Sequence, residues 1–401
     1  MKRRVEQLVA PFRTIAIDAR LSSLLLILAT IVALAWANSS WQRTYEALWS
    51  RPLSIGAGGR TLELSARDWI NDALMALFFL VVGLEIEREL LVGSLRSVKA
   101  AALPIAAAIG GMLVPAALYL LVAGRTPEAH GWGIPMATDI AFALGLLGLL
   151  APGVPPAVRA FLAALAIVDD LGAILVIAVA YGAPPDWQAL ALCATCIALL
   201  FTLRWLNVRI LTIYLLLAVP LWLSLRAGGI HPSLSGVIVA FAIPPQSPDD
   251  DTPSPSLRTE LALHGWVAVG ILPLFALANA GVPLRASFAA GAPLEAIVGV
   301  MLGLVIGKPI GIIGATWLAV RANLAALPEG LTWPRVAIVG CFGGIGFTMS
   351  IFVTSLAFTN AGTAGAAKGA VLLASVTAAA LGAVVVRLVE RNAAPGATTG
   401  S

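Results

Sequence analysis

Long apolar stretches separated by short polar segments dominate the chain from residue 21 onward. We count twelve stretches that approach the length of about 20 residues needed for an α-helix to cross a bilayer. Their centres lie near residues 29, 77, 112, 141, 168, 195, 215, 236, 271, 308, 346 and 377. The pattern predicts an all-α polytopic membrane protein with about twelve transmembrane helices.

Composition favours the same class of protein. Hydrophobic residues make up 59% of the 401 positions and charged residues 11%, whereas soluble proteins carry about 25% charged residues. The mean hydropathy is +0.94. A soluble helical domain with buried helices is the alternative, and twelve such stretches argue against it.

The distribution of Lys and Arg predicts an orientation. If both termini are cytoplasmic, 16 of the 25 Lys and Arg residues fall on the cytoplasmic side, as the positive-inside rule requires. Residues 1–20 are then a cytoplasmic arm and residues 391–401 a cytoplasmic tail, flanking a transmembrane domain at 21–390. The net charge of +4 follows from this topology and does not indicate a nucleic-acid partner.

Two polar segments differ from the other connections. Residues 53–64, LSIGAGGRTLEL, have two β-prone arms around a Gly-rich turn, which predicts a β-hairpin on the periplasmic side. Residues 244–260, PPQSPDDDTPSPSLRTE, are rich in Pro, Ser and Asp, and we interpret them as a flexible cytoplasmic linker.

Gly and Pro interrupt the fourth and eleventh spans at corresponding places in the two halves of the chain. The fourth contains GWGIPMATDIAFALG and the eleventh VGCFGGIGFTMSIF. A pair of interrupted spans is the best sequence indication of a transporter site. Glycines also allow close helix packing, so for the eleventh span taken alone both interpretations stay open.

Four ionisable residues lie near the middle of predicted spans: Asp139, Asp169, Asp170 and Lys308. A charge at that depth costs about 3 kcal/mol on insertion scales. Because Asp169 and Asp170 are adjacent, their two carboxylates do not readily stay ionised together in a poorly solvated site. Their oxygens also suit hard cations. Competition between protons and a cation for one site predicts an exchanger.

The remaining two charges are expected to support this pair. Lys308 can compensate a carboxylate in the empty site, although a purely structural ion pair is the alternative. Asp139 is expected to cap the amides of a half-helix, with Thr138 lining the cation route.

Seven motifs together closely resemble the bacterial NhaA-type Na⁺/H⁺ antiporters over residues 20–390. They are FFLVVGLEIEREL, GIPMATDIAFALG, ALAIVDDLGAI, HPSLSGVIVAF, LPLFALANAGV, GKPIGI and GGIGFTMSIF. The resemblance implies a fold with two inverted three-helix repeats. It also implies that the fourth and eleventh helices are unwound and cross.

The same resemblance implies roles for individual residues. Asp169 and Asp170 form the Na⁺/Li⁺ and H⁺ site, Lys308 pairs with Asp169, Asp139 balances the positive half-helix ends, and Thr138 lies near the ion. Six further positions are candidates for pH response: Glu85, Arg88, Glu89, His231, Glu260 and His264. The hairpin corresponds to a homodimer contact, and the location is the bacterial inner membrane.

The prediction is therefore a transporter of Na⁺, Li⁺ and H⁺ in a lipid bilayer, not an enzyme, and without a cofactor. An intramembrane aspartyl protease would need two Asp residues on facing helices, usually within G-x-G-D, and the sequence contains no such motif. A passive cation channel stays open as an alternative. The acidic pair argues against an organic-anion symporter.

Overall fold

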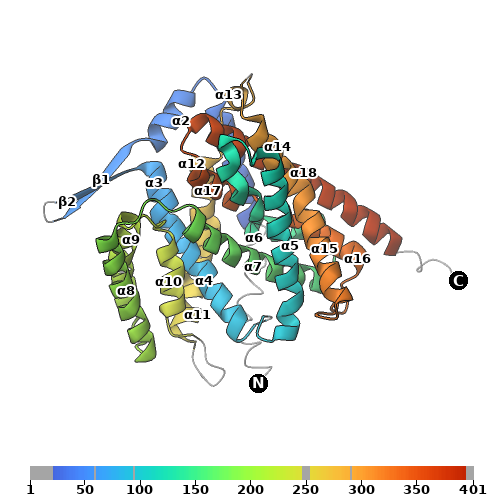
Figure 1. Cartoon of the computed structure of the whole chain (residues 1–401), viewed down its shortest axis with the longest axis horizontal. Helices are drawn as coiled ribbons and strands as arrows, with labels where there is room; N and C mark the ends of the chain where they lie inside the picture. The colour runs from blue at the N-terminus through green and yellow to red at the C-terminus, as the bar shows by residue number, and fades with distance from the viewer. Residues whose placement is uncertain (1–20, 58–59, 94, 246–252, 290, 394–401) are drawn as a thin grey trace. The chain divides into compact units, whose positions relative to one another are not determined.

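The computed structural model describes residues 21–57, 60–93, 95–245, 253–289 and 291–393. These residues are mostly helical (Figure 1). Seven helices among them are long and apolar enough to cross a membrane, or ten if each of three bent helix pairs forms one span. The shorter helices α9 (Leu211–Ala227) and α10 (Leu234–Ala242) lie at two further predicted centres. The all-α polytopic class is thus confirmed, and the total of about twelve spans stays a prediction.

The chain forms two compact units, which we describe separately. The first comprises Met1–Arg96 and Ile174–Pro283, and the second Ser97–Ala173 and Leu284–Ser401. The helices described in the first unit are Leu21–Ala37, α2 (Gln42–Trp49), α3 (Ala66–Trp69), η1 (Ile70–Leu74), α4 (Met75–Leu91), α8 (Trp187–Trp205), α9, α10, α11 (Pro255–Trp266), η3 (Val267–Ile271) and α12 (Leu272–Asn279). Those of the second unit are α5 (Val98–Ala123), η2 (Pro127–Met136), α6 (Ile140–Leu150), α7 (Pro156–Ala180, which runs on into the first unit), α13 (Leu284–Ser287), α14 (Leu294–Leu302), η4 (Gly303–Gly307), α15 (Lys308–Arg321), α16 (Trp333–Gly343), α17 (Phe347–Ala357) and α18 (Ala361–Ala393).

The predicted hairpin is present in the first unit. Strands β1 (Pro52–Ala57) and β2 (Arg60–Ser65) pair antiparallel, with Leu53 opposite Leu64. Ser65 ends the hairpin and begins α3, because its hydroxyl oxygen accepts a hydrogen bond from the backbone N–H of Asp68 at 3.1 Å. The side of the membrane on which the hairpin lies, and its role in a dimer, stay predictions.

The first unit packs α4, α8, α9 and α10 around a shared apolar core (Figure 1). Cys193 and Cys196 of α8 are buried in this core, beside Leu80 of α4. The helix formed by α3, η1 and α4 runs without interruption over Ala66–Leu91. Residues at different positions along this continuous helix are therefore held at fixed distances from one another.

The linker prediction for residues 244–260 was wrong at its C-terminal end. Residues 246–252 lie outside the described residues, but Pro255 already begins α11. The hydroxyl oxygen of Ser254 accepts from the N–H of Leu257 at 3.2 Å, and Pro255 occupies the first helical position. Ser at the N-cap followed by Pro is a helix-start signal, which the Pro- and Ser-rich composition of the segment concealed.

In the second unit the same order of helices occurs twice. A long helix, a bent pair and another long helix extend over residues 98–180, and again over residues 294–391. The first bent pair, η2 with α6, turns by 51°, and the second, α16 with α17, by 45°. These bends lie at the Gly- and Pro-containing interruptions of the fourth and eleventh spans.

The first helices of the two sets, α5 and α15, lie side by side (Figure 1). Gly110 of α5 meets Gly311 of α15 so closely that a Cβ on Gly110 would lie 2.3 Å from the carbonyl oxygen of Gly311. Small residues allow helix backbones to approach in this way inside membranes. This contact brings the start of α15, and with it Lys308, next to α5.

Candidate functional site

The two helix breaks of the second unit are hydrogen-bonded to each other. The backbone N–H of Asp139, between η2 and α6, donates to the carbonyl of Ile345, between α16 and α17, at 2.8 Å. The hydroxyl of Ser350 in α17 donates to the carbonyl of Ile134 in η2 at 2.7 Å. Unwound backbone at membrane depth is tolerated only where its polar groups are satisfied, and here each break helps to satisfy the other.

Asp139 caps both half-helices that begin at the breaks. Its Oδ1 accepts from the N–H of Phe142 in α6 at 2.9 Å. Its Oδ2 accepts from the N–H of Thr348 in α17 at 3.0 Å and also from the Thr348 hydroxyl. A helix N-terminus carries roughly half an elementary positive charge, so one carboxylate balances two helix ends. The sequence predicts the cap on α6, whereas Thr348 was missed as a partner.

Asp169 and Lys308 form an ion pair that is fully buried in the second unit. The Lys308 ammonium donates to Asp169 Oδ2 and, at 2.9 Å, to the hydroxyl oxygen of Thr138. The single hydroxyl proton of Thr138 points either to Asp169 Oδ2 at 2.6 Å or to the carbonyl of Gly343 at 2.8 Å. Thr138 therefore links the ion pair to the C-terminal end of α16.

Asp170 follows Asp169 on α7 and is 2% exposed. Among the described residues, no group donates a hydrogen bond to the buried Oδ1 of Asp169. The second unit thus buries two adjacent carboxylates with one ammonium paired to Asp169, and the Oδ1 atom of Asp169 remains available to a second positive charge.

A π-helical turn, η4, places Lys308 at this site. The turn ends at Gly307, directly before Lys308. A Cβ on Gly303 would lie 2.5 Å from Cβ of Pro135 in η2, and a Cβ on Gly344 would lie 2.4 Å from the carbonyl oxygen of Leu304. The turn is therefore packed against both helix breaks, and single π-helical turns often occur at functional sites.

Five of the six candidates for pH response lie together in the first unit, on α4 and α11. The guanidinium of Arg88 lies 3.1 Å from Glu260, 3.0 Å from Glu89 and 3.9 Å from Glu85. Glu260 is 3% exposed. His264 lies one turn further along α11 and acts electrostatically on Glu85. The ion pair between Arg88 and Glu260 therefore connects α4 to α11.

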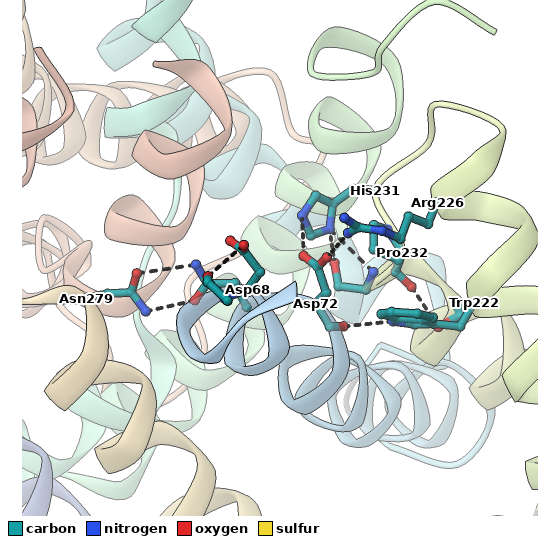
Figure 2. Close-up of polar contacts among 11 residues, drawn as sticks. Asp68, Asp72, Trp222, Arg226, His231, Pro232 and Asn279 are labelled. Atoms are coloured by element: carbon teal, nitrogen blue, oxygen red, sulfur yellow. Dashed lines mark hydrogen bonds and ion pairs between the residues drawn. The ribbon is translucent and has the colours of Figure 1, made fainter. Parts of the chain in front are cut away.

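His231, the sixth candidate, belongs to a different group of residues in the same unit. Figure 2 shows His231 and Arg226 both directed toward Asp72, which lies in η1. The imidazole Nε2 is 3.5 Å from Asp72 Oδ1, and Arg226 pairs with Oδ2. Asp72 and Arg88 are sixteen residues apart on one continuous helix, about 24 Å at 1.5 Å per residue, so the two groups lie far apart.

The neighbours of Asp72 fix its position. The indole N–H of Trp222 donates to the Asp72 backbone carbonyl at 3.1 Å, and the Asn279 amide donates to the side chain of the adjacent Asn71 at 2.8 Å (Figure 2). A cavity of about 330 Å³ adjoins the group, with Tyr181 and Arg226 among its lining residues. The pairing of Asp72 with Arg226 was not predicted from the sequence.

Burial, and secondarily the positive charge of Arg226, lower the pKa of His231 to about 4. Because the Asp72 carboxylate is already paired with Arg226, it does little to hold a proton on the imidazole. In the unfolded chain the pKa is about 6.5, so between these values the unfolded state binds a proton that the folded state does not. Stability is therefore lost as the pH falls from about 6.5 toward 4, by about 2–3 kcal/mol.

We expect His231→Gln to remove most of this pH dependence, because Gln does not titrate. The measurement is the thermal unfolding midpoint in detergent at pH 7.5 and pH 5 for the wild type and the variant. His130→Gln, at an exposed histidine in η2, is the matched control. An equal acid-induced loss of stability in wild type and His231→Gln would contradict the expectation.

Comparison with known proteins gives a match over nearly the whole chain. Residues 13–386 match a family model described as Na⁺/H⁺ antiporter 1. A protein of Oleidesulfovibrio alaskensis named Na(+)/H(+) antiporter NhaA is 44% identical, over 98% of this chain and 96% of its own length. A Yersinia pseudotuberculosis protein of the same name is 46% identical, over 91% of this chain and 93% of its own.

Proposed function

Since this chain belongs to the Na⁺/H⁺ antiporter 1 family, we propose that it exports Na⁺ or Li⁺ across a bacterial inner membrane in exchange for H⁺. The observation that carries this proposal is the buried group of Asp169, Asp170, Lys308 and Thr138 beside the two helix breaks. The group combines two carboxylates with one ammonium in a site from which water is excluded.

In the proposed cycle, the ammonium of Lys308 compensates Asp169 while no cation is bound. A cation that enters takes the place of the ammonium and binds oxygen atoms of Asp169, Asp170 and Thr138, which are hard ligands. Protons bind the same carboxylates when the site faces the other side of the membrane. Cation and protons therefore compete, and access to the site alternates between the two sides.

The proposal includes two further properties, activation at alkaline pH and electrogenic exchange. Protons occupy the carboxylates at low pH, so activity should rise as the pH becomes alkaline. If more protons enter than cations leave in each cycle, the exchange is electrogenic. We assign modulation of this pH response to the cluster around Arg88. His231, whose pKa of about 4 keeps it neutral above pH 6, would act only through its contact with Asp72.

The finer architecture is part of the proposal. We propose twelve spans with both termini in the cytoplasm, and two inverted three-helix repeats whose unwound helices cross. The repeated helix order of the second unit supports the presence of two repeats. We propose that the hairpin of β1 and β2 lies in the periplasm and joins two copies of the chain into a homodimer.

Proton flux in inside-out vesicles tests the function. Vesicles acidified by respiration are given NaCl, LiCl or KCl from pH 6 to pH 9, with the membrane potential clamped by K⁺ and valinomycin. We expect Na⁺ or Li⁺ to release protons increasingly with pH, and K⁺ to release none above the level of vesicles lacking the protein. A passive cation channel would give no proton release under the clamp.

The concentration of Na⁺ should shift the pH profile. Because cation and proton are proposed to share one site, raising Na⁺ is expected to move the onset of activity to lower pH. The measurement repeats the vesicle assay over a hundred-fold range of NaCl. A profile that does not respond to Na⁺ would instead favour a separate sensor, with Glu260 and His264 as the first positions to replace.

Asp139→Asn should weaken exchange without abolishing it. Asn keeps one oxygen that can cap α6, but its amide nitrogen cannot accept the hydrogen bonds from Thr348. We expect the apparent KM for Na⁺ to rise about ten-fold, because the N–H of Thr348 loses its charged acceptor, whereas the Thr348 hydroxyl can turn to accept from the Asn amide. Complete loss of exchange by a correctly folded variant would make Asp139 a direct cation ligand.

A further inference from the structure

The half-helix α17 begins without a cap of its own. Its N-cap is Gly346, which has no side chain to accept a hydrogen bond. The first N–H groups of a helix have no partner within the helix, and here two of them are satisfied from other elements. Asp139 accepts from the N–H of Thr348, and Ser375 Oγ of α18 accepts from the N–H of Phe347 at 3.2 Å.

Ser375 lies in an apolar stretch of α18, AVLLASVTAAALGAVVV, and is 2% exposed. Burying a hydroxyl is unfavourable unless it is hydrogen-bonded. Thr377, two residues later, is partly exposed and uses its hydroxyl in the ordinary way of helical Ser and Thr residues, donating to the carbonyl of Leu373 in its own helix at 2.8 Å. Ser375 differs because its oxygen accepts from a different helix.

Three steps connect Ser375 to the ion pair. Its hydroxyl holds the N–H of Phe347, and the next residue, Thr348, donates twice to Asp139. Asp139 directly follows Thr138, whose hydroxyl contacts Asp169. Every one of these residues is at most 2% exposed, so no water is available to replace a missing partner.

We propose that Ser375 is a positioning residue for cation binding. It orients the first turn of α17, and through Thr348 and Asp139 it sets the place of Thr138 beside the aspartate pair. Without the hydroxyl, the N–H of Phe347 is buried with no acceptor, and the first turn of α17 shifts. The cation site is then distorted although no cation ligand has been removed.

The test measures the apparent KM for Na⁺, which reports cation affinity and does not depend on how much folded protein is present. It rests on the proposed function, so wild-type chain reconstituted in liposomes must first show Na⁺-driven proton movement; its absence would contradict that function. For Ser375→Ala we expect the apparent KM for Na⁺ to rise about three- to ten-fold, the range that loss of one helix cap gives. Turnover at saturating Na⁺ should stay within about two-fold, because the titrating residues are unchanged.

Two further variants complete the experiment. Thr377→Ala, on the same helix, should keep the wild-type KM, and Ser375→Thr, which restores a hydroxyl, should return the KM to within about two-fold of wild type. If Ser375→Ala is not recovered folded, Ser375→Cys, with a sulfur of similar size that accepts only weakly, takes its place. An unchanged KM in folded Ser375→Ala or Ser375→Cys, beside an active wild type, would overturn the proposal.

Discussion

Replacing Asp169 or Asp170 by Asn is expected to abolish Na⁺-dependent proton release in inside-out vesicles. Each change removes one charged oxygen ligand and one titrating group while keeping the volume of the side chain. Each variant lacks one of the two titrating carboxylates that the proposed cycle uses, so we expect cation exchange to fall at least about 100-fold. Release should not return at higher Na⁺, because Asn cannot carry a proton through the cycle.

The two variants should differ in stability although both are inactive. Asp169 is the ion-pair partner of Lys308, so Asp169→Asn leaves a buried ammonium without its carboxylate and should lower the unfolding midpoint in detergent more than Asp170→Asn. Asp186→Asn is the matched control, because Asp186 caps α8 at an exposed position and Asn caps helices equally well. Near-normal exchange by either site variant would refute the shared-site mechanism.

Hydropathy and chain-breaking residues predict much of this fold. Each of the twelve predicted centres falls on a helix or a bent helix pair, because a lipid-facing helix must be apolar over most of its length. The hairpin at β1 and β2 follows from alternation around a Gly-rich turn. Composition alone fails at α11, where Ser254 and Pro255 start a helix inside a segment that resembles a linker.

Some residues of the candidate site can be predicted from the sequence, and others cannot. Ionisable residues in apolar spans are conspicuous, so Asp139, Asp169, Asp170 and Lys308 can be found from the sequence. Their partners cannot, because a hydroxyl such as Thr348 is unremarkable in a span. Thr348 is 209 residues from Asp139, and only the packing of α17 against η2 brings them together.

π-helical turns show why the direction of a side chain is hard to predict. An ideal helix advances by 100° per residue, but a π-helical turn inserts one residue and rotates everything that follows. Such a turn directly precedes Lys308, and another contains Asp72. No single residue type marks these turns, so the periodicity of the sequence does not reveal toward which neighbour either charge points.

Lys308→Gln is expected to destabilise the protein and to change the charge moved in each cycle. Gln is polar and of similar length, but it carries no charge to compensate Asp169. Leaving that buried carboxylate without its partner costs about 3–5 kcal/mol, less if Asp169 takes up a proton. The first measurement is the unfolding midpoint in detergent, with Lys308→Arg as the control that keeps the charge.

The change in charge movement follows from what happens to Lys308 when a cation binds. The cation displaces the ammonium from Asp169, and an ammonium without a counter-charge in a poorly solvated site gives up its proton readily. Lys308 would then carry a proton in each cycle, so both Gln and Arg, which do not release one at physiological pH, should make residual exchange less electrogenic. The measurement is current on a solid-supported membrane, compared with Na⁺ uptake in the same liposomes. Residual exchange with the wild-type charge per Na⁺ in both variants would remove Lys308 from the proton pathway and leave it only the structural role of the ion pair.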